Sequence, residues 1–253
     1  MTEAIQIRVE GEDRLPTLIY LPGIHGDWTL ITNLRQSLRG RVRFVYFTYP
    51  RTLEWSLDDY AAAVEAALAA QNIRAGWLLA ESFGSQVAWA MVGRGKLALA
   101  GLILAGGFVR HPMPWIVEPA GSLCRRSCLR LFAPFYLAYA KIFRWKNRSN
   151  PELLENIQEF MARRTELDLR AIRHRLRLIA GNDPRPLARA AKLPVYGLTG
   201  LVDPIVPWPL VRGWLRRHCA SLRDYQIIAC ADHNVLNMGA KPAAKKILEW
   251  MNA

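Results

Sequence analysis

The chain has 253 residues and carries 34 Lys and Arg against 21 Asp and Glu, a formal net charge of +13 at pH 7. Its composition is 51% hydrophobic and 22% charged, which is close to the globular average and excludes a disordered or fibrous chain. Four cysteines in a chain of this length do not make a disulfide scaffold, and no CxxC pair or Cys/His cluster indicates zinc.

The N-terminal residues do not resemble a targeting segment. Residues 1–14 contain four acidic side chains and no apolar stretch, unlike a signal or transit peptide. The longest uncharged apolar run covers 97–109 and includes three glycines, so it is too short to cross a bilayer. We therefore expect a cytoplasmic protein.

Residues 1–107 alternate between strand-like and helix-like segments. Runs rich in β-branched, aromatic and other apolar residues predict strands over 5–9, 17–20, 42–48, 77–80 and 99–105. Apolar residues at helical spacing predict helices over 27–38, 60–71 and 84–92. Continuous apolar strands that alternate with helices are typical of a parallel sheet covered on both faces.

The rhythm changes after residue 107. Residues 108–190 show helical segments punctuated by prolines, and they hold 16 Lys and Arg against 7 Asp and Glu. The alternation then resumes with strands over 194–199 and 224–229 and helices over 207–217 and 241–251. We predict an α/β core of residues 1–107 and 191–253, with residues 108–190 as a helical insertion that carries most of the basic excess.

One serine stands where a strand turns into a helix. The sequence around Ser82 reads A-E-S-F-G and follows the apolar run 77–80. Such a turn lifts a hydroxyl clear of the sheet, and it requires small residues two positions before and two after the serine. Ala80 occupies the first of these positions in place of the more usual glycine. The pattern favours Ser82 as a nucleophile over a serine that only caps the next helix.

A glycine-containing loop follows the second predicted strand. It reads L-P-G-I-H-G over residues 21–26, and its position suits a loop that supplies backbone donors to a developing oxyanion. The expected donors are the N–H groups of Ile24 and Phe83, each typically worth about 3–4 kcal/mol in the transition state. A glycine-rich turn without a ligand is the alternative.

An acid and a histidine follow the last two predicted strands. Asp203 lies in G-L-V-D-P-I-V-P, and His233 lies in A-D-H-N. Because both follow parallel strands, as Ser82 does, we expect all three side chains at the carboxyl edge of one sheet, where open α/β sheets place their sites. Asp27 and Asp232 are rival acids, but Asp27 suits a helix cap and Asp232 adjoins the histidine too closely in sequence.

These motifs resemble those of the α/β-hydrolase superfamily along nearly the whole chain. The resemblance implies a mostly parallel sheet with helices on both faces and a helical cap inserted after the sixth of the usual eight strands. It also implies Ser82 as nucleophile, His233 as base and Asp203 as the acid that orients it, in the order expected for this fold. A serine nucleophile argues against the dehalogenases and epoxide hydrolases of this fold, which use aspartate.

The implied activity is hydrolysis of an ester or thioester through an acyl-enzyme, without cofactor or metal. Trp115, Phe132, Phe135 and Tyr136 in the insertion favour an apolar acyl group. Acyl transfer or C–C bond hydrolysis by the same three residues is one alternative. Another is a non-catalytic scaffold whose basic insertion binds an anionic ligand, a membrane or a partner. The sequence leaves the oligomeric state open.

Several other side chains receive simpler interpretations. We expect Glu81 to be exposed, His25 to be a loop residue, and His111, His174 and His218 to lie on the surface or in the insertion. The basic and apolar segment 123–145 could contact anionic lipid or attract an anionic substrate, although a solvated face is the simpler explanation. Nucleic-acid binding is disfavoured because no recognition motif is present.

Overall fold

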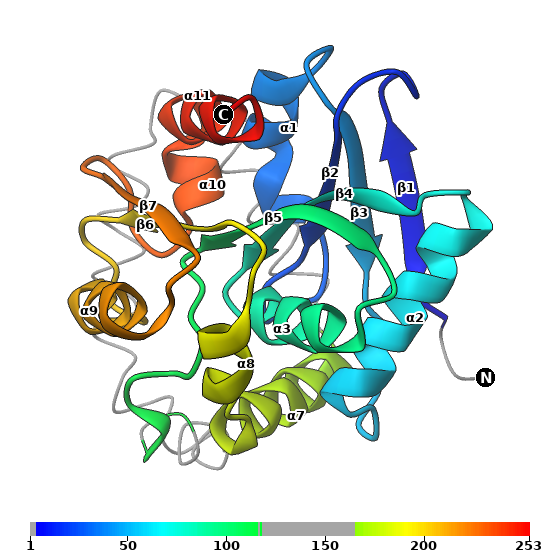
Figure 1. Cartoon of the computed structure of the whole chain (residues 1–253). Helices are drawn as coiled ribbons and strands as arrows, with labels where there is room; N and C mark the ends of the chain where they lie inside the picture. The colour runs from blue at the N-terminus through cyan, green and yellow to red at the C-terminus, as the bar shows by residue number, and fades with distance from the viewer. Residues whose placement is uncertain (1–3, 116, 118–164) are drawn as a thin grey trace.

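The computed structural model describes residues 4–115, 117 and 165–253, and its element labels follow Figure 1. These residues form a seven-stranded sheet in the spatial order β1-β3-β2-β4-β5-β6-β7. All neighbouring strands are parallel except β1, which pairs antiparallel with β3 at one edge. The strands are β1 (Gln6–Glu10), β2 (Thr17–Leu21), β3 (Arg43–Thr48), β4 (Ala75–Glu81), β5 (Ala98–Ala105), β6 (Val195–Gly200) and β7 (Leu222–Ile228).

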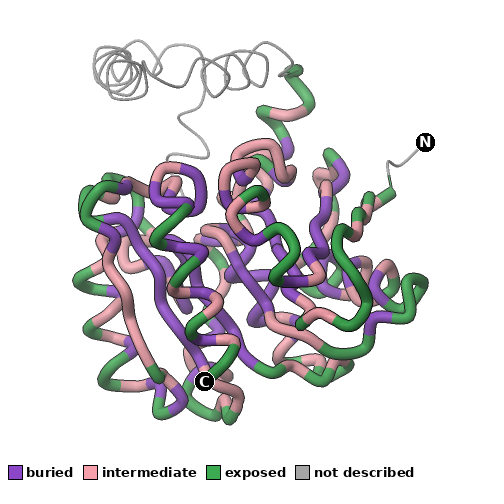
Figure 2. The backbone as a smooth tube through the Cα atoms, turned by 90° about the horizontal axis from the view of Figure 1, so that it is seen from above, coloured by how far each residue is buried: buried purple, intermediate pink, exposed green. Residues whose placement is uncertain are grey.

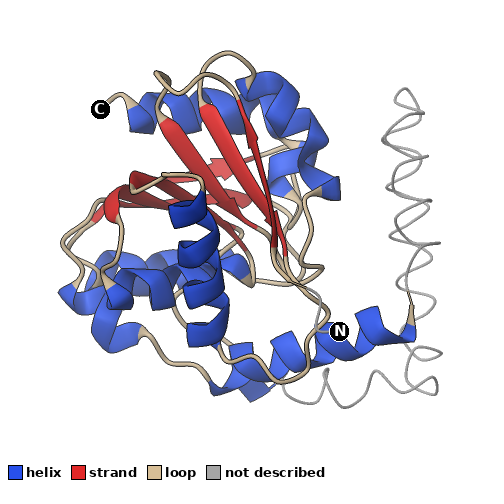
Figure 3. Cartoon of the chain, turned by 90° about the vertical axis from the view of Figure 1, so that its right-hand side faces the viewer, coloured by secondary structure: helices blue, strands red, loops and turns tan. Residues whose placement is uncertain are grey.

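Helices cover both faces of the sheet (Figures 1 and 3). The core cluster on one face includes residues of η1 (Thr29–Ile31), α1 (Thr32–Leu38), α10 (Val235–Met238) and α11 (Ala240–Met251). The cluster on the other face includes residues of α2 (Leu57–Ala70), α3 (Gly84–Arg94), α7 (Glu166–Gly181), α8 (Arg185–Ala190) and α9 (Trp208–His218). The buried positions gather on the strands and on the inner sides of these helices (Figure 2).

Every strand predicted from the sequence coincides with an observed strand, and the predicted α/β class is confirmed. The predicted position of the insertion is wrong: the segment follows the fifth strand, β5, and not the sixth. The prediction assumed the usual eight strands, of which six precede the insertion. The described sheet holds seven strands, and five of them, β1 to β5, precede residue 108. Two short helices, α8 and α10, were not predicted.

Part of the predicted insertion lies outside the described residues. This applies to Phe132, Phe135, Tyr136 and the basic segment 123–145. The division into a core of 1–107 and 191–253 and a cap of 108–190 therefore stays a prediction. Within the described part of that segment, α7 and α8 contribute Ile179 and Ala188 to the core cluster that also contains residues of α3.

Candidate active site

Ser82 occupies a tight turn between β4 and α3. Its φ angle is +47°, in the left-handed region that residues other than glycine seldom adopt. Gly84 has to be a glycine because a Cβ there would lie 2.3 Å from the carbonyl oxygen of Leu21. Ala80 is completely buried, so its methyl group fits into the sheet. The turn therefore has the strained geometry expected of a nucleophile elbow.

The side chain of His233 is bonded on both sides. Its Nδ1 lies 2.8 Å from Oδ2 of Asp203, and its Nε2 lies 3.0 Å from Oγ of Ser82. The loop after β6 supplies Asp203, and the loop between β7 and α10 supplies His233. The structure thus brings the three predicted residues into one hydrogen-bonded chain at the carboxyl edge of the sheet.

The Asp203 carboxylate is fully buried and held by backbone donors. Its Oδ1 accepts from the N–H groups of Ile205 and Val206, both at 2.9 Å, which leaves Oδ2 directed at the imidazole. On the other side, a Cβ at Gly106 would lie 3.3 Å from the ring of His233. The imidazole therefore lies between the Asp203 carboxylate and Gly106, in the loop after β5.

The charge around His233 favours its protonated form. Burial acts to lower the pKa of the imidazole, but the hydrogen bond and charge of Asp203 oppose it, and Glu81 and Asp232 add to the negative field. The net result is a pKa above the usual value of 6.5. The imidazole therefore takes up a proton more readily than an unperturbed histidine does.

The loop after β2 lies against the elbow. Gly26 N–H donates to the Gly23 carbonyl at 2.9 Å, and Gly26 has a φ of +77°, so residues 23–26 form a tight turn. A Cβ at Gly84 would also meet the Pro22 carbonyl oxygen at 3.0 Å. The close approach of Gly84 to the Pro22 carbonyl therefore joins two segments. One is the loop that leads into the turn with Ile24, and the other is the elbow, where Phe83 directly follows Ser82.

Comparison with known proteins identifies the family. The sequence model of the "Alpha/beta hydrolase family" matches residues 19–244. The chain belongs to the α/β hydrolase family. No curated protein gives a significant match.

Solved structures of other α/β hydrolases superpose along almost the whole chain. An enol-lactonase from Burkholderia xenovorans LB400 is 16% identical with a TM-score of 0.80, covering 98% of this chain and 96% of that one. A thermophilic esterase from Thermogutta terrifontis is 20% identical with a TM-score of 0.75 and coverages of 98% and 93%. An esterase from Rhodococcus sp. ECU1013 is 18% identical with a TM-score of 0.73 and coverages of 98% and 94%. These likenesses establish the fold.

In this α/β hydrolase, the residue before Ser82 is not the exposed side chain expected from the sequence. Glu81 is half-buried and accepts a hydrogen bond from the hydroxyl of Tyr20, which is completely buried on β2. The backbone N–H of Gly23 also donates to Glu81. Burial raises the pKa of this carboxyl, while Tyr20 and the nearby His233 act to lower it. Glu81 thus joins the elbow to the loop that contains Ile24.

Removing the charge of Glu81 should change the pH dependence of activity. Because the Glu81 carboxylate helps to raise the pKa of His233, Glu81→Gln should lower that pKa. A general base must be neutral to act, so the acid limb of the kcat/KM profile should shift to lower pH. The measurement is kcat/KM against pH, with Glu249→Gln, at an exposed position of α11, as the control. An unmoved limb, or one that moves upward, would contradict the interpretation.

The other residues singled out in the sequence take structural positions. Asp27 accepts from Thr29 N–H at 2.9 Å, but Trp28 is the N-cap of η1 and this cap has no side-chain hydrogen bond, so the expected capping role of Asp27 is wrong. Asp232 accepts from Asn234 N–H at 2.9 Å. His174, on α7, contacts the carbonyl oxygen of Trp55 at 2.7 Å. His111 was expected on the surface or in the insertion, and it is not a surface residue because it is buried. Burial lowers the pKa of its imidazole.

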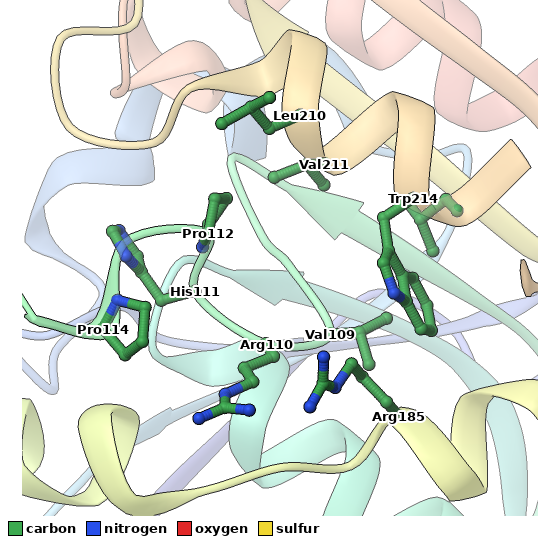
Figure 4. A pocket seen from close by; sticks show the side chains of 10 residues that line it. Val109, Arg110, His111, Pro112, Pro114, Arg185, Leu210, Val211 and Trp214 are labelled. Atoms are coloured by element: carbon green, nitrogen blue, oxygen red, sulfur yellow. The ribbon is translucent and has the colours of Figure 1, made fainter. Parts of the chain in front are cut away.

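A cavity of about 420 Å³ lies between the loop after β5 and helix α9, and Figure 4 shows the side chains that line it. The loop after β5, the start of α8 and helix α9 supply its lining side chains, namely Val109, Arg110, His111, Pro112, Pro114, Arg185, Leu210, Val211, Trp214 and Leu215. Its size is that of a small-molecule pocket. Arg110 and Arg185 both pair with Asp183, at 3.1 and 2.7 Å, so the lining combines an apolar wall with a partly neutralised basic rim.

Within 4–115 and 165–253, no group of three His, Cys, Asp or Glu side chains is arranged to hold a metal ion. Among the same residues, no helix combines the length and the apolar character that a bilayer crossing requires.

Proposed function

We propose that this chain is a serine hydrolase that cleaves a carboxylic ester or thioester through a covalent acyl-enzyme. The observation that carries the proposal is the His233 ring, bonded to Ser82 on one side and to Asp203 on the other at 3.0 and 2.8 Å. Two structural neighbours that are esterases support the same reaction class.

The proposed reaction begins with attack by Ser82. Its Oγ forms a bond to the acyl carbon while Nε2 of His233 takes the hydroxyl proton. Asp203 accepts from Nδ1–H, keeps the imidazole in the required tautomer and stabilises the cation that forms. The negative oxygen of the tetrahedral intermediate is received by the N–H groups of Ile24 and Phe83. The leaving group then departs with the proton from Nε2.

The second half of the cycle repeats these steps with water. His233 takes a proton from a water molecule, whose oxygen attacks the acyl carbon, and Ser82 leaves with the proton returned by Nε2. The products are a carboxylic acid and the alcohol or thiol. We further propose an apolar acyl group, because Trp115 is 68% exposed at the start of the insertion and the neighbouring cavity has an apolar wall.

Labelling with a fluorophosphonate tests the proposal. We expect a covalent adduct on Ser82, located by mass spectrometry, because only an activated serine displaces fluoride from such a probe at a useful rate. Ser82→Ala should abolish the adduct, whereas Ser37→Ala on α1 should leave it unchanged. Absence of labelling in folded wild-type protein would refute the proposal. A positive result leads to a screen of esters and thioesters of increasing acyl length.

A further inference from the structure

The turn that contains Ile24 is held by a side chain that lies 151 residues further along the sequence. We propose that Arg175, on α7, is a positioning residue that fixes this turn and thereby sets the geometry of the oxyanion hole. The inference rests on the proposed function, since it concerns the donor that Ile24 would supply.

Arg175 is almost completely buried, with 2% of its side chain exposed, and it reaches three separate segments. One terminal nitrogen donates to the Ile24 carbonyl at 2.9 Å, and the other donates to the Pro50 carbonyl at 3.0 Å. Its Nε lies 3.3 Å from the hydroxyl of Tyr60. None of these three partners is a carboxylate, so the cation is satisfied by neutral oxygens.

Two tyrosine rings complete the surroundings of the guanidinium. The rings of Tyr49 and Tyr60 lie 5.7 and 5.9 Å from its central carbon, within the range of cation–π attraction. A buried charge without a counter-ion is costly, and an apolar side chain of similar size would anchor α7 equally well. The fork of donors in Arg175 provides what an apolar residue lacks, namely directed bonds to the loop carbonyls.

The turn is shaped to admit the guanidinium. A Cβ at Gly26 would lie 2.4 Å from a terminal nitrogen of Arg175. The same residue has a φ of +77°, a value that favours glycine. Gly26 therefore serves two purposes: it closes the turn and it leaves room for Arg175.

Hydrogen bonds hold several neighbouring backbone groups of the turn. Gly23 N–H donates to Glu81, the Gly23 carbonyl accepts from Gly26 N–H, and the Ile24 carbonyl accepts from Arg175. The Gly26 carbonyl accepts from Tyr49 N–H at 2.7 Å. The Gly23 carbonyl and Ile24 N–H belong to one peptide group, and the Ile24 carbonyl that Arg175 holds belongs to the next one. Loss of the Arg175 bond would free the peptide after Ile24 to rotate, and an oxyanion donor is effective only when it is oriented beforehand.

The test compares Arg175→Lys and Arg175→Met with two controls. Tyr60→Phe removes a partner of Arg175 that lies outside the turn and keeps the aromatic ring. Arg177→Lys alters an exposed arginine of the same helix. Each variant is assayed for kcat and KM on a 4-nitrophenyl ester, for the rate of fluorophosphonate labelling, and for its thermal unfolding midpoint.

We expect Arg175→Met to lower kcat and the labelling rate by about 10- to 100-fold, somewhat less than the loss of a whole oxyanion donor. KM should change little, because the misplaced donor serves the transition state more than the bound ester. Arg175→Lys, which keeps the charge and can still bond the Ile24 carbonyl, should recover part of the loss. Tyr60→Phe and Arg177→Lys should retain wild-type kcat.

Amide hydrogen exchange provides a readout that does not depend on activity. Gly26 N–H should lose protection in the Arg175 variants and keep it in Tyr60→Phe. Folded Arg175 variants with unchanged kcat and unchanged exchange would overturn the inference, and so would an equal loss of kcat in Tyr60→Phe. An inert wild-type enzyme would refute the proposed function, while the exchange result would still decide whether Arg175 holds the turn. If Arg175→Met does not fold, Arg175→Lys carries the same comparisons.

Discussion

Replacement of either Ser82 or His233 by alanine should lower kcat by about 10⁶-fold, and replacement of both should lower it no further. The reason is the single hydrogen bond of 3.0 Å that joins the two side chains. Without His233, the hydroxyl of Ser82 has no acceptor for its proton. Without Ser82, the imidazole has no nucleophile to activate. Since each residue acts only through the other, the two losses are not additive.

The measurement is kcat of the two single variants and the double variant on the best ester or thioester substrate. His218→Ala, at the end of α9, is a matched control because this ring packs on Trp214, 5.1 Å away between centroids. It should leave kcat unchanged. A double variant that loses the sum of two independent effects would mean that Ser82 and His233 do not act as a pair.

Asp203→Asn should lower kcat by about 10⁴-fold while leaving the fold intact. The oxygen of the new amide can still accept from Ile205 and Val206 N–H, as Oδ1 does now at 2.9 Å. Its NH₂ group would then face Nδ1 of His233, which accepts a hydrogen bond only in the other tautomer. That tautomer carries a proton on Nε2 and cannot take one from Ser82.

Asp232→Asn is the matched control, because Asp232 is the rival acid next to His233 in sequence. Its Oδ1 accepts from Asn234 N–H, so it should have a much smaller effect on kcat. Imidazole NMR signals of the two variants would report the tautomer of His233 directly. If Asp232→Asn were the more damaging change, Asp203 would not be the orienting acid.

The fold and the convergence of Ser82, Asp203 and His233 could be predicted from the sequence because they follow local rules. The strands are short apolar runs, and Ser82, Asp203 and His233 each lie in the turn or loop that follows one of them. Since parallel strands end at one edge, chain order alone indicates that their loops converge. The small residues around Ser82 are likewise a local requirement, and Gly84 shows why, because its missing Cβ admits the end of β2.

Glu81 and Arg175 were not accessible in this way because their roles depend on distant partners. Glu81 is separated by 61 residues from Tyr20, and Arg175 by 151 residues from Ile24. In the sequence, Arg175 is one of several arginines at helical spacing on a basic segment, and the pattern suggests a solvated face. No local signal distinguishes Arg175, which is buried, from the arginines beside it on α7.

The position of Arg175 bears on how this enzyme could be re-engineered. An exchange of residues 108–190 for the corresponding segment of another family member would remove α7, and with it Arg175, which bonds the Ile24 carbonyl. The start of α7 is itself tied to the core through an ion pair between Asp168 and Arg51. A chimera that replaces only residues 118–164 would keep both contacts. The useful crossover point for altering specificity therefore precedes Thr165, well before the return to the sheet at β6.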